Sequence, residues 1–221
     1  HTQKLSRNSC SSYFNKVRAA LKEATKDGYL LRNPADDIEG IKEAETKREF
    51  LTLEELQKAI DAHCEIEVIK DAFIFSALTG LRFSDIQKLT WNEIQYSEEI
   101  GYYIRFKQKK TKGQETLPVS EDAVKLLGER LSGNEPVFRD LTYSEYNNQK
   151  IREWMIRAGV DKYITFHCAR HTYATLQLTL GTDIYTVSKL LGHKNLRTTE
   201  VYAKIIDEKK VAAANRIKVK L

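Results

Sequence analysis

Apolar side chains recur every three to four residues along most of this chain of 221 residues, and this helical spacing changes to an alternating one in a single region. The region spans residues 101–120, where the segments GYYIRFKQ and QETLPVS lie on either side of KKTKG. Aromatic and β-branched residues on both sides of a turn that contains glycine are typical of a β-hairpin. The sequence therefore predicts a mainly α-helical protein with one small antiparallel β-sheet, an α+β fold.

Capping signals place the individual helices. Thr52 and Glu55 form a capping box that begins one helix. Another helix is expected to begin at Ser120 and to turn Leu131 inward. The remaining helices are predicted over residues 11–30, 72–80, 84–90, 143–158, 165–181 and 183–192.

A charged segment, KEAETKRE at residues 42–49, interrupts the apolar pattern and is expected to be an exposed linker. We place a domain boundary there, between residues 1–45 and residues 46–221. With 41% hydrophobic residues overall, the chain can bury one sizeable core. Because the chain begins with His1 and its single methionine is Met155, we expect it to be a fragment or a processed chain.

Composition argues against several classes of protein. No apolar run approaches the ~20 residues that a membrane-spanning helix needs, and the N-terminus lacks the pattern of a secretory signal. Cys10, Cys64 and Cys168 are too few and too widely spaced for a disulfide framework, so we expect a reducing, cytoplasmic environment. The formal net charge of +5 permits an anionic partner without requiring one.

The segment FHCARHTYAT, residues 166–175, brings His167, Arg170 and His171 close together in the sequence. A metal site, a packed helix and a phosphate site all predict such a cluster. His167 and His171 have the i, i+4 spacing of a zinc-binding pair, but the glutamate of an H-E-x-x-H site is absent, and the arginine would repel a cation. We therefore expect no metal here. Packing remains the alternative for each residue taken singly.

Further side chains suited to an anion lie outside this cluster. Arg82 follows a buried helix, His193 follows a helix-ending glycine at a predicted loop tip, and Tyr202 lies in a helix rich in lysine and arginine. Three lysines crowd the hairpin turn. Each feature also has a purely structural interpretation: an ion pair of Arg82 with Asp85, a loop histidine, a half-buried tyrosine, or a solvated turn.

Together these residues fit the chemistry of a phosphodiester under nucleophilic attack. Charge develops on the non-bridging oxygens, which guanidinium groups bind in a bidentate manner. Histidine can donate to the same oxygens or transfer a proton. A tyrosine phenol can be the nucleophile and form a covalent intermediate, while a lysine protonates the leaving 5′ oxygen. No metal is needed when cationic side chains supply the stabilisation.

The order of these motifs resembles that of the catalytic domain of tyrosine recombinases, the integrases of phages and transposons. The resemblance is carried by ALTGLRFSDI, the hairpin lysine before TLPVS, FHCARHTYAT and LLGHKNLRTTEVYAKI. It implies the tyrosine recombinase catalytic-domain fold, with a C-terminal tail, for residues 46–221. It also implies that residues 1–45 are the end of a helical core-binding domain and its linker.

The resemblance also implies a catalytic set. The family uses two arginines, a hairpin lysine, a histidine three residues before the second arginine, a further His or Trp, and a nucleophilic tyrosine. The family pattern selects one of the three hairpin lysines, and His171 is left over and expected to be structural. The matching residues are Arg82, Lys110, His167, Arg170, His193 and Tyr202, with Asp85 supporting the first arginine.

The implied function is site-specific DNA recombination, the integration or excision of a mobile element through a 3′-phosphotyrosine intermediate. Because the intermediate conserves bond energy, no cofactor is expected. The implied partners are double-stranded recombination sites, a tetramer of the full-length protein on DNA and accessory DNA-bending factors, in the cytoplasm at the nucleoid. Two alternatives stay open: strand relaxation by a type IB topoisomerase, and a non-catalytic DNA-binding module of the same fold.

Overall fold

The computed structural model describes residues 5–44, 48–107 and 114–202. The chain divides into two compact units, residues 1–47 and residues 48–221, each with its own internal contacts. The hairpin lysine Lys110 and the C-terminal tail after residue 202 lie outside the described residues.

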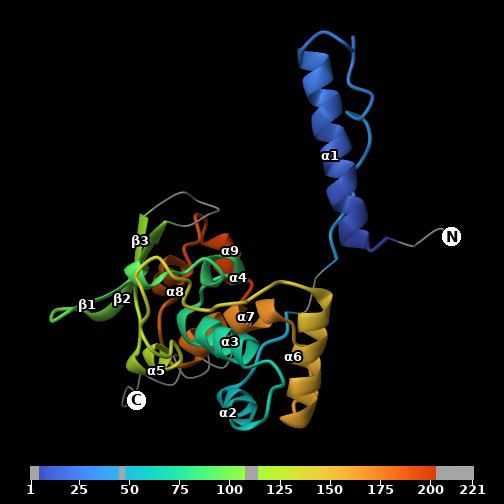
Figure 1. Ribbon diagram of the computed structural model, residues 1–221. Helices are drawn as coiled ribbons and strands as arrows, with labels where there is room; N and C mark the ends of the chain where they lie inside the picture. The colour runs from blue at the N-terminus through green and yellow to red at the C-terminus, as the bar shows by residue number, and fades with distance from the viewer. Residues whose placement is uncertain (1–4, 45–47, 108–113, 203–221) are drawn as a thin grey trace, which may run out of the picture. The chain divides into compact units, whose positions relative to one another are not determined.

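The first unit contains one long helix and the chain that follows it. Helix α1 spans Arg7–Lys26 (Figure 1), and the Ser6 hydroxyl caps it by accepting a hydrogen bond from the Ser9 N–H. The helix thus begins at residue 7 rather than at the predicted residue 11, because a polar cap and not an apolar side chain sets its start. Asn8 exchanges two hydrogen bonds with the backbone of Ala44, which fixes the end of the following chain.

The second unit is mainly helical with a small antiparallel sheet, so the predicted fold class is confirmed. Helices α3 and α7 pack side by side at its centre (Figure 1). Within the described ranges, no helix is both long enough and apolar enough to cross a bilayer. The α-helices are α2 (Leu53–Asp61), α3 (Glu67–Thr79), α4 (Phe83–Ile86), α5 (Glu121–Lys125), α6 (Glu145–Arg157), α7 (Phe166–Thr179), α8 (Ile184–Leu190) and α9 (Arg197–Glu200), with a short 3-10 helix, η1, at Trp91–Glu93.

The sheet has three strands in the order β1-β2-β3, all antiparallel. Strands β2 (Gly101–Lys107) and β3 (Gln114–Pro118) are the predicted hairpin. Strand β1 (Ile94–Ser97) was not predicted. It is short and buries only Ile94, so the sequence has too little alternation to reveal it, and pairing with β2 is what makes it a strand.

One predicted helix is much shorter than expected. Helix α5 begins after Ser120, as predicted, but ends at Lys125, and Gly128 follows with a left-handed φ of 70°. The chain therefore leaves the helical path before Leu131, whose side chain is 41% exposed. The prediction that Leu131 faces inward was wrong for this reason.

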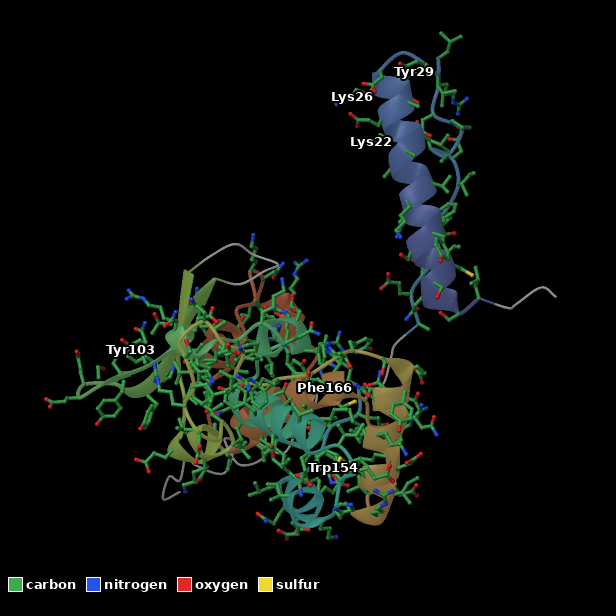
Figure 2. All side chains as sticks on the ribbon, in the orientation of Figure 1. Lys22, Lys26, Tyr29, Tyr103, Trp154 and Phe166 are labelled. Carbon is green, nitrogen blue, oxygen red and sulfur yellow. The ribbon has the colours of Figure 1, made fainter. Side chains whose placement is uncertain are left out.

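The core of the second unit is built around aromatic side chains. The ring of Phe73 on α3 makes edge-to-face contacts with Trp154 (5.4 Å between centroids) and Phe166 (5.9 Å). The Trp154 indole N–H donates to the Ala59 carbonyl, which joins α6 to α2 (Figure 2). These contacts hold α2, α3, α6 and α7 as one body, and α7 carries the cluster singled out in the sequence.

Gly80 turns the chain sharply after α3. It has a left-handed φ of 71°, and a Cβ at this position would lie 2.6 Å from the Tyr173 ring on α7. Only glycine satisfies both the conformation and the close approach. The turn brings the carbonyl of Gly80 against α7, and α4 starts three residues later at Phe83, so that Arg82 is the N-cap of α4.

Candidate active site

Arg170 lies in the first half of α7 and is only 5% exposed. Its Nη1 donates to the Gly80 carbonyl (2.5 Å), and its Nη2 donates to the Leu191 carbonyl (2.6 Å) and lies 3.1 Å from Nε2 of His193. The two carbonyls belong to the C-cap residues that directly follow α3 and α8, where the helix dipole favours a cation. Three of the five guanidinium N–H groups are thus used, and the described contacts leave two for a bound anion.

His193 follows Gly192 after α8 and is half-buried rather than projecting from a loop tip. Its backbone N–H donates to the Ser188 carbonyl, and its Nδ1 lies 2.8 Å from the buried hydroxyl of Thr199. With Nε2 against Arg170, both ring nitrogens are engaged. The segment from α8 to α9 therefore fixes this imidazole beside the guanidinium.

Arg82 and Asp85 form an ion pair at the first turn of α4, with 3.7 Å between Nη1 and Oδ2. The Asp85 side chain is 5% exposed and that of Arg82 is 22% exposed. The ion pair considered in the sequence analysis thus exists. It does not isolate Arg82, whose charge acts on both Arg170 and His193 and lowers the pKa of each.

Tyr202 is 4% exposed, and its phenol oxygen lies 2.6 Å from Nδ1 of His171. The ring of His171 in turn meets the ring of His167 edge to face at 4.6 Å, and His167 is exposed. The guanidinium carbon of Arg48 lies 5.9 Å from the centre of the Tyr202 ring. The tyrosine is therefore surrounded by residues from α7 and from the segment that precedes α2.

Burial and positive charge determine the protonation states in this cluster. Burial, followed by the charges of Arg170, Arg82 and Arg48, lowers the pKa of His193 to about 4. Burial, followed by the neighbouring His167 and the two arginines Arg48 and Arg170, lowers the pKa of His171 to about 3. Both imidazoles are thus neutral at pH 7.

Burial shifts the pKa values of Tyr202 and Arg170 in opposite directions. It raises the pKa of Tyr202, against the smaller lowering influence of Arg48 and Arg170, so the phenol is protonated at rest. Burial and the charge of Arg82 lower the pKa of Arg170 to about 10, which still leaves the guanidinium charged at neutral pH. A positive, largely desolvated site with one protonated phenol is suited to an anion that the phenol can attack.

The structure thus brings together four of the predicted site residues, Arg82, Arg170, His193 and Tyr202, with Asp85 behind the first. His167 lies on the exposed side of α7, in ring contact with His171. In the part of the chain that the structure describes, no three His, Cys, Asp or Glu side chains are grouped as metal ligands. The arrangement can bind an anion through the arginines and present a phenol to it.

Sequence reasoning passed over two residues of this cluster. His171 was expected to be only structural, yet it contacts the Tyr202 oxygen; its i, i+4 spacing from His167 was the available signal. Arg48 lies in the charged segment assigned as linker, and nothing in that segment distinguishes it from its neighbours. Only the packing of the segment before α2 against α7 reveals it.

Because His171 and His193 are neutral in the folded protein, we expect its stability to fall in acid. Because the folded pKa of His171 lies below the ordinary value of 6.5, its contribution is complete above pH 6.5 and is lost as pH falls toward 3. Between pH 7.5 and 5, His171 should account for about 2 kcal/mol of lost unfolding free energy, at 1.36 kcal/mol per pKa unit. We expect His171→Asn to reduce this pH dependence in denaturant titrations, and His63→Asn, at an exposed position, to leave it unchanged. Equal pH dependence in wild type and His171→Asn would contradict the assignment.

Comparison with known proteins gives a consistent result. The description of the Phage integrase family matches residues 49–209, and that of the phage integrase SAM-like domain matches residues 1–44. The chain is 26% identical over 215 residues to a tyrosine recombinase of Thermosipho africanus, covering 94% of this chain and 75% of the relative. It is 28% identical over 224 residues to tyrosine recombinase XerC of Oceanobacillus iheyensis, covering 93% and 72%.

Solved structures share the fold at low sequence identity. The XerH site-specific recombinase, in a post-cleavage complex with its palindromic difH substrate, matches with a TM-score of 0.74 at 17% identity, covering 96% of this chain and 68% of that one. The Tn1549 transposon integrase in complex with a circular intermediate DNA matches with a TM-score of 0.70 at 19% identity, covering 97% and 80%. This chain spans about two thirds to three quarters of the length of the curated relatives it matches.

Proposed function

Because this chain belongs to the phage integrase family, we propose that it is the DNA-cleaving part of a site-specific tyrosine recombinase, which breaks and rejoins DNA strands to integrate or excise a mobile element. The observation that carries the proposal is the convergence of Arg82, Arg170, His193 and Tyr202 around the first half of α7. These residues come from four separate segments, and ordinary packing gives no reason to gather two arginines around a tyrosine.

We assign the two arginines to the scissile phosphate. Arg170 offers the two guanidinium N–H groups that its contacts with the two carbonyls and His193 leave, and Arg82 adds a second, more exposed guanidinium held by Asp85. His193 is neutral and its Nε2 accepts from Arg170, so it orients that guanidinium without adding charge. His167, exposed on α7, is proposed to donate to the same phosphate from its other side.

The reaction proceeds by exchange of one phosphodiester for another. The Tyr202 phenol releases its proton to solvent as its oxygen attacks phosphorus, and the bond from phosphorus to the 5′ oxygen of the next nucleotide breaks, leaving a 3′-phosphotyrosine. The departing oxygen takes a proton to become a 5′-hydroxyl, and we propose Lys110 as the donor. The 5′-hydroxyl of the partner strand then attacks the phosphotyrosine and releases Tyr202. Each step conserves a phosphoester bond, so no nucleotide cofactor is consumed.

The remaining assignments follow from the family. Residues 1–45, which match the SAM-like domain, are proposed to be the end of the core-binding domain and the linker, with residues 46–221 as the catalytic domain. Double-stranded recombination sites are the proposed DNA partners. For the full-length protein we propose a tetramer on DNA, accessory DNA-bending factors, and a cytoplasmic location at the nucleoid.

A nicked duplex tests the proposal. Cleavage beside a nick releases a short fragment that cannot religate, so the covalent complex accumulates and survives denaturing electrophoresis. We expect this complex to form with duplexes whose overlapping sequences cover the junctions of the mobile element around the gene. Absence of any covalent complex would leave a non-catalytic DNA-binding module. Relaxation of supercoiled DNA without strand exchange to a second labelled site would instead indicate a topoisomerase.

A further inference from the structure

The phenol of Tyr202 has a partner that the catalytic set does not include. Nδ1 of His171 lies 2.6 Å from the phenol oxygen, and the two rings are 5.6 Å apart. Both side chains are buried, Tyr202 at 4% and His171 at 7% exposure. A contact this short between buried polar groups fixes the rotation of the phenol, because losing it would leave both groups desolvated without a partner.

His171 is suited to hold the phenol without taking its proton. The cationic surroundings and burial lower the pKa of His171 to about 3, while burial raises the pKa of Tyr202. A neutral imidazole and a protonated phenol can share this hydrogen bond in either direction, so the contact persists across the neutral pH range. The imidazole is therefore a poor acceptor for the proton that the nucleophile must lose.

The position of His171 in the chain links the nucleophile to the anion site. His171 is the residue directly after Arg170 on one continuous helix, and both residues are buried. Arg170 is fixed by two carbonyls, so the distance between the guanidinium and the held phenol is set by a single rigid element. Tyr202 itself follows α9, the last described helix, and depends on α7 for its orientation.

A second group, the guanidinium of Arg48, lies near the Tyr202 ring. Arg48 lies 5.9 Å from the centre of the Tyr202 ring, within the range of a cation–π contact. The segment that carries Arg48 is anchored: the Leu51 N–H donates to the Thr172 hydroxyl, and the Lys162 ammonium donates to the Phe50 carbonyl. Thr172 is the residue after His171, so the segment that carries Arg48 is anchored to the same part of α7 that carries His171.

We propose that His171 is a positioning residue for strand cleavage, whose Nδ1 holds the Tyr202 phenol in the place from which it attacks the phosphate bound by Arg170. The inference rests on the proposed role of Tyr202 as nucleophile. It goes further by assigning the orientation of that nucleophile to a residue outside the catalytic set.

The first test needs no DNA. Denaturant titrations of wild type, His171→Leu, Tyr202→Phe and the double variant form a double-mutant cycle. If the hydrogen bond exists, the double variant should be more stable than the sum of the two single losses predicts. Additive losses would overturn the contact, whatever the chain does to DNA.

The second test measures the rate of covalent complex formation with a nicked duplex under single-turnover conditions. His171→Leu should lower the rate at least roughly tenfold, the scale for one lost hydrogen bond. His171→Asn should recover most of it, because an asparagine side chain places a polar atom near the position of Nδ1. Ile151→Ala is the matched control, since it removes buried side-chain volume on α6 without touching Tyr202 and should leave the rate unchanged.

The outcomes distinguish a failure of the proposed function from a failure of the positioning role of His171. If wild type forms no covalent complex, the proposed function fails, and the stability cycle still decides the contact. If wild type reacts and His171→Leu reacts equally fast or faster, the contact does not position the nucleophile for attack. If His171→Asn is as slow as His171→Leu, the imidazole acts through its shape and the positioning role is wrong.

Discussion

Replacing Tyr202 with phenylalanine is expected to abolish the covalent protein–DNA complex and to leave DNA binding intact. Phenylalanine keeps the buried ring, and it removes the phenol oxygen that we propose forms the 3′-phosphotyrosine. The loss should be complete on the scale of a denaturing gel, because no second hydroxyl on this ring can substitute. Stability should fall by about 1 kcal/mol, because the substitution leaves His171 Nδ1 buried without its partner.

Tyr185 provides the control for this experiment. It lies on α8 and is 61% exposed, so it is accessible to DNA while making no contact with the cluster described above. Tyr185→Phe should form the covalent complex at the wild-type rate. Mass spectrometry of the trapped wild-type complex should find the phosphodiester on Tyr202. A nucleotide on Tyr185, or a complex that persists in Tyr202→Phe, would show that another residue is the nucleophile.

Replacing Arg170 with alanine is expected to reduce cleavage by at least ~100-fold, the scale for losing one preorganised donor at a developing oxyanion. The substitution should also destabilise the fold, since the carbonyls of Gly80 and Leu191 lose their buried donor at about 1–3 kcal/mol each. Arg170→Lys should rescue poorly, because one ammonium cannot bind both carbonyls and a phosphate in the geometry of a planar fork. The measurements are single-turnover cleavage below the melting temperature and denaturant titration of each variant.

Alanine substitutions at Arg82 and Arg139 provide the comparison for the Arg170 variants. Arg82→Ala should lose a similar factor in cleavage and should also lower stability, because it leaves the buried Asp85 carboxylate without its ion-pair partner. Arg139→Ala, at an exposed pair with Glu135, should change neither quantity appreciably. Near-normal cleavage by Arg170→Lys would count against the bidentate role of Arg170.

The sequence was informative where local signals act alone. The capping box at Thr52, the glycine after α3 and the switch to alternating residues at 101–120 each depend on neighbours in the chain, and each is found in the structure. Strand β1 and the end of α5 were missed, because the first depends on pairing with β2 and the second on a change of direction at Gly128. Local periodicity carries no information about either.

The chain by itself determined which chemical groups are present: two arginines, histidines and a tyrosine, in an order that resembles the catalytic set of the phage integrase family. Tertiary structure decided how those groups are used. Arg170 became a buried anchor because the ends of α3 and α8 converge on it, and His171 became the partner of Tyr202 because the segment after α9 packs on α7. These contacts join residues 21 to 90 positions apart. Hydrogen bonds at that separation depend on how elements pack, and the pattern of side chains along any one element does not encode them.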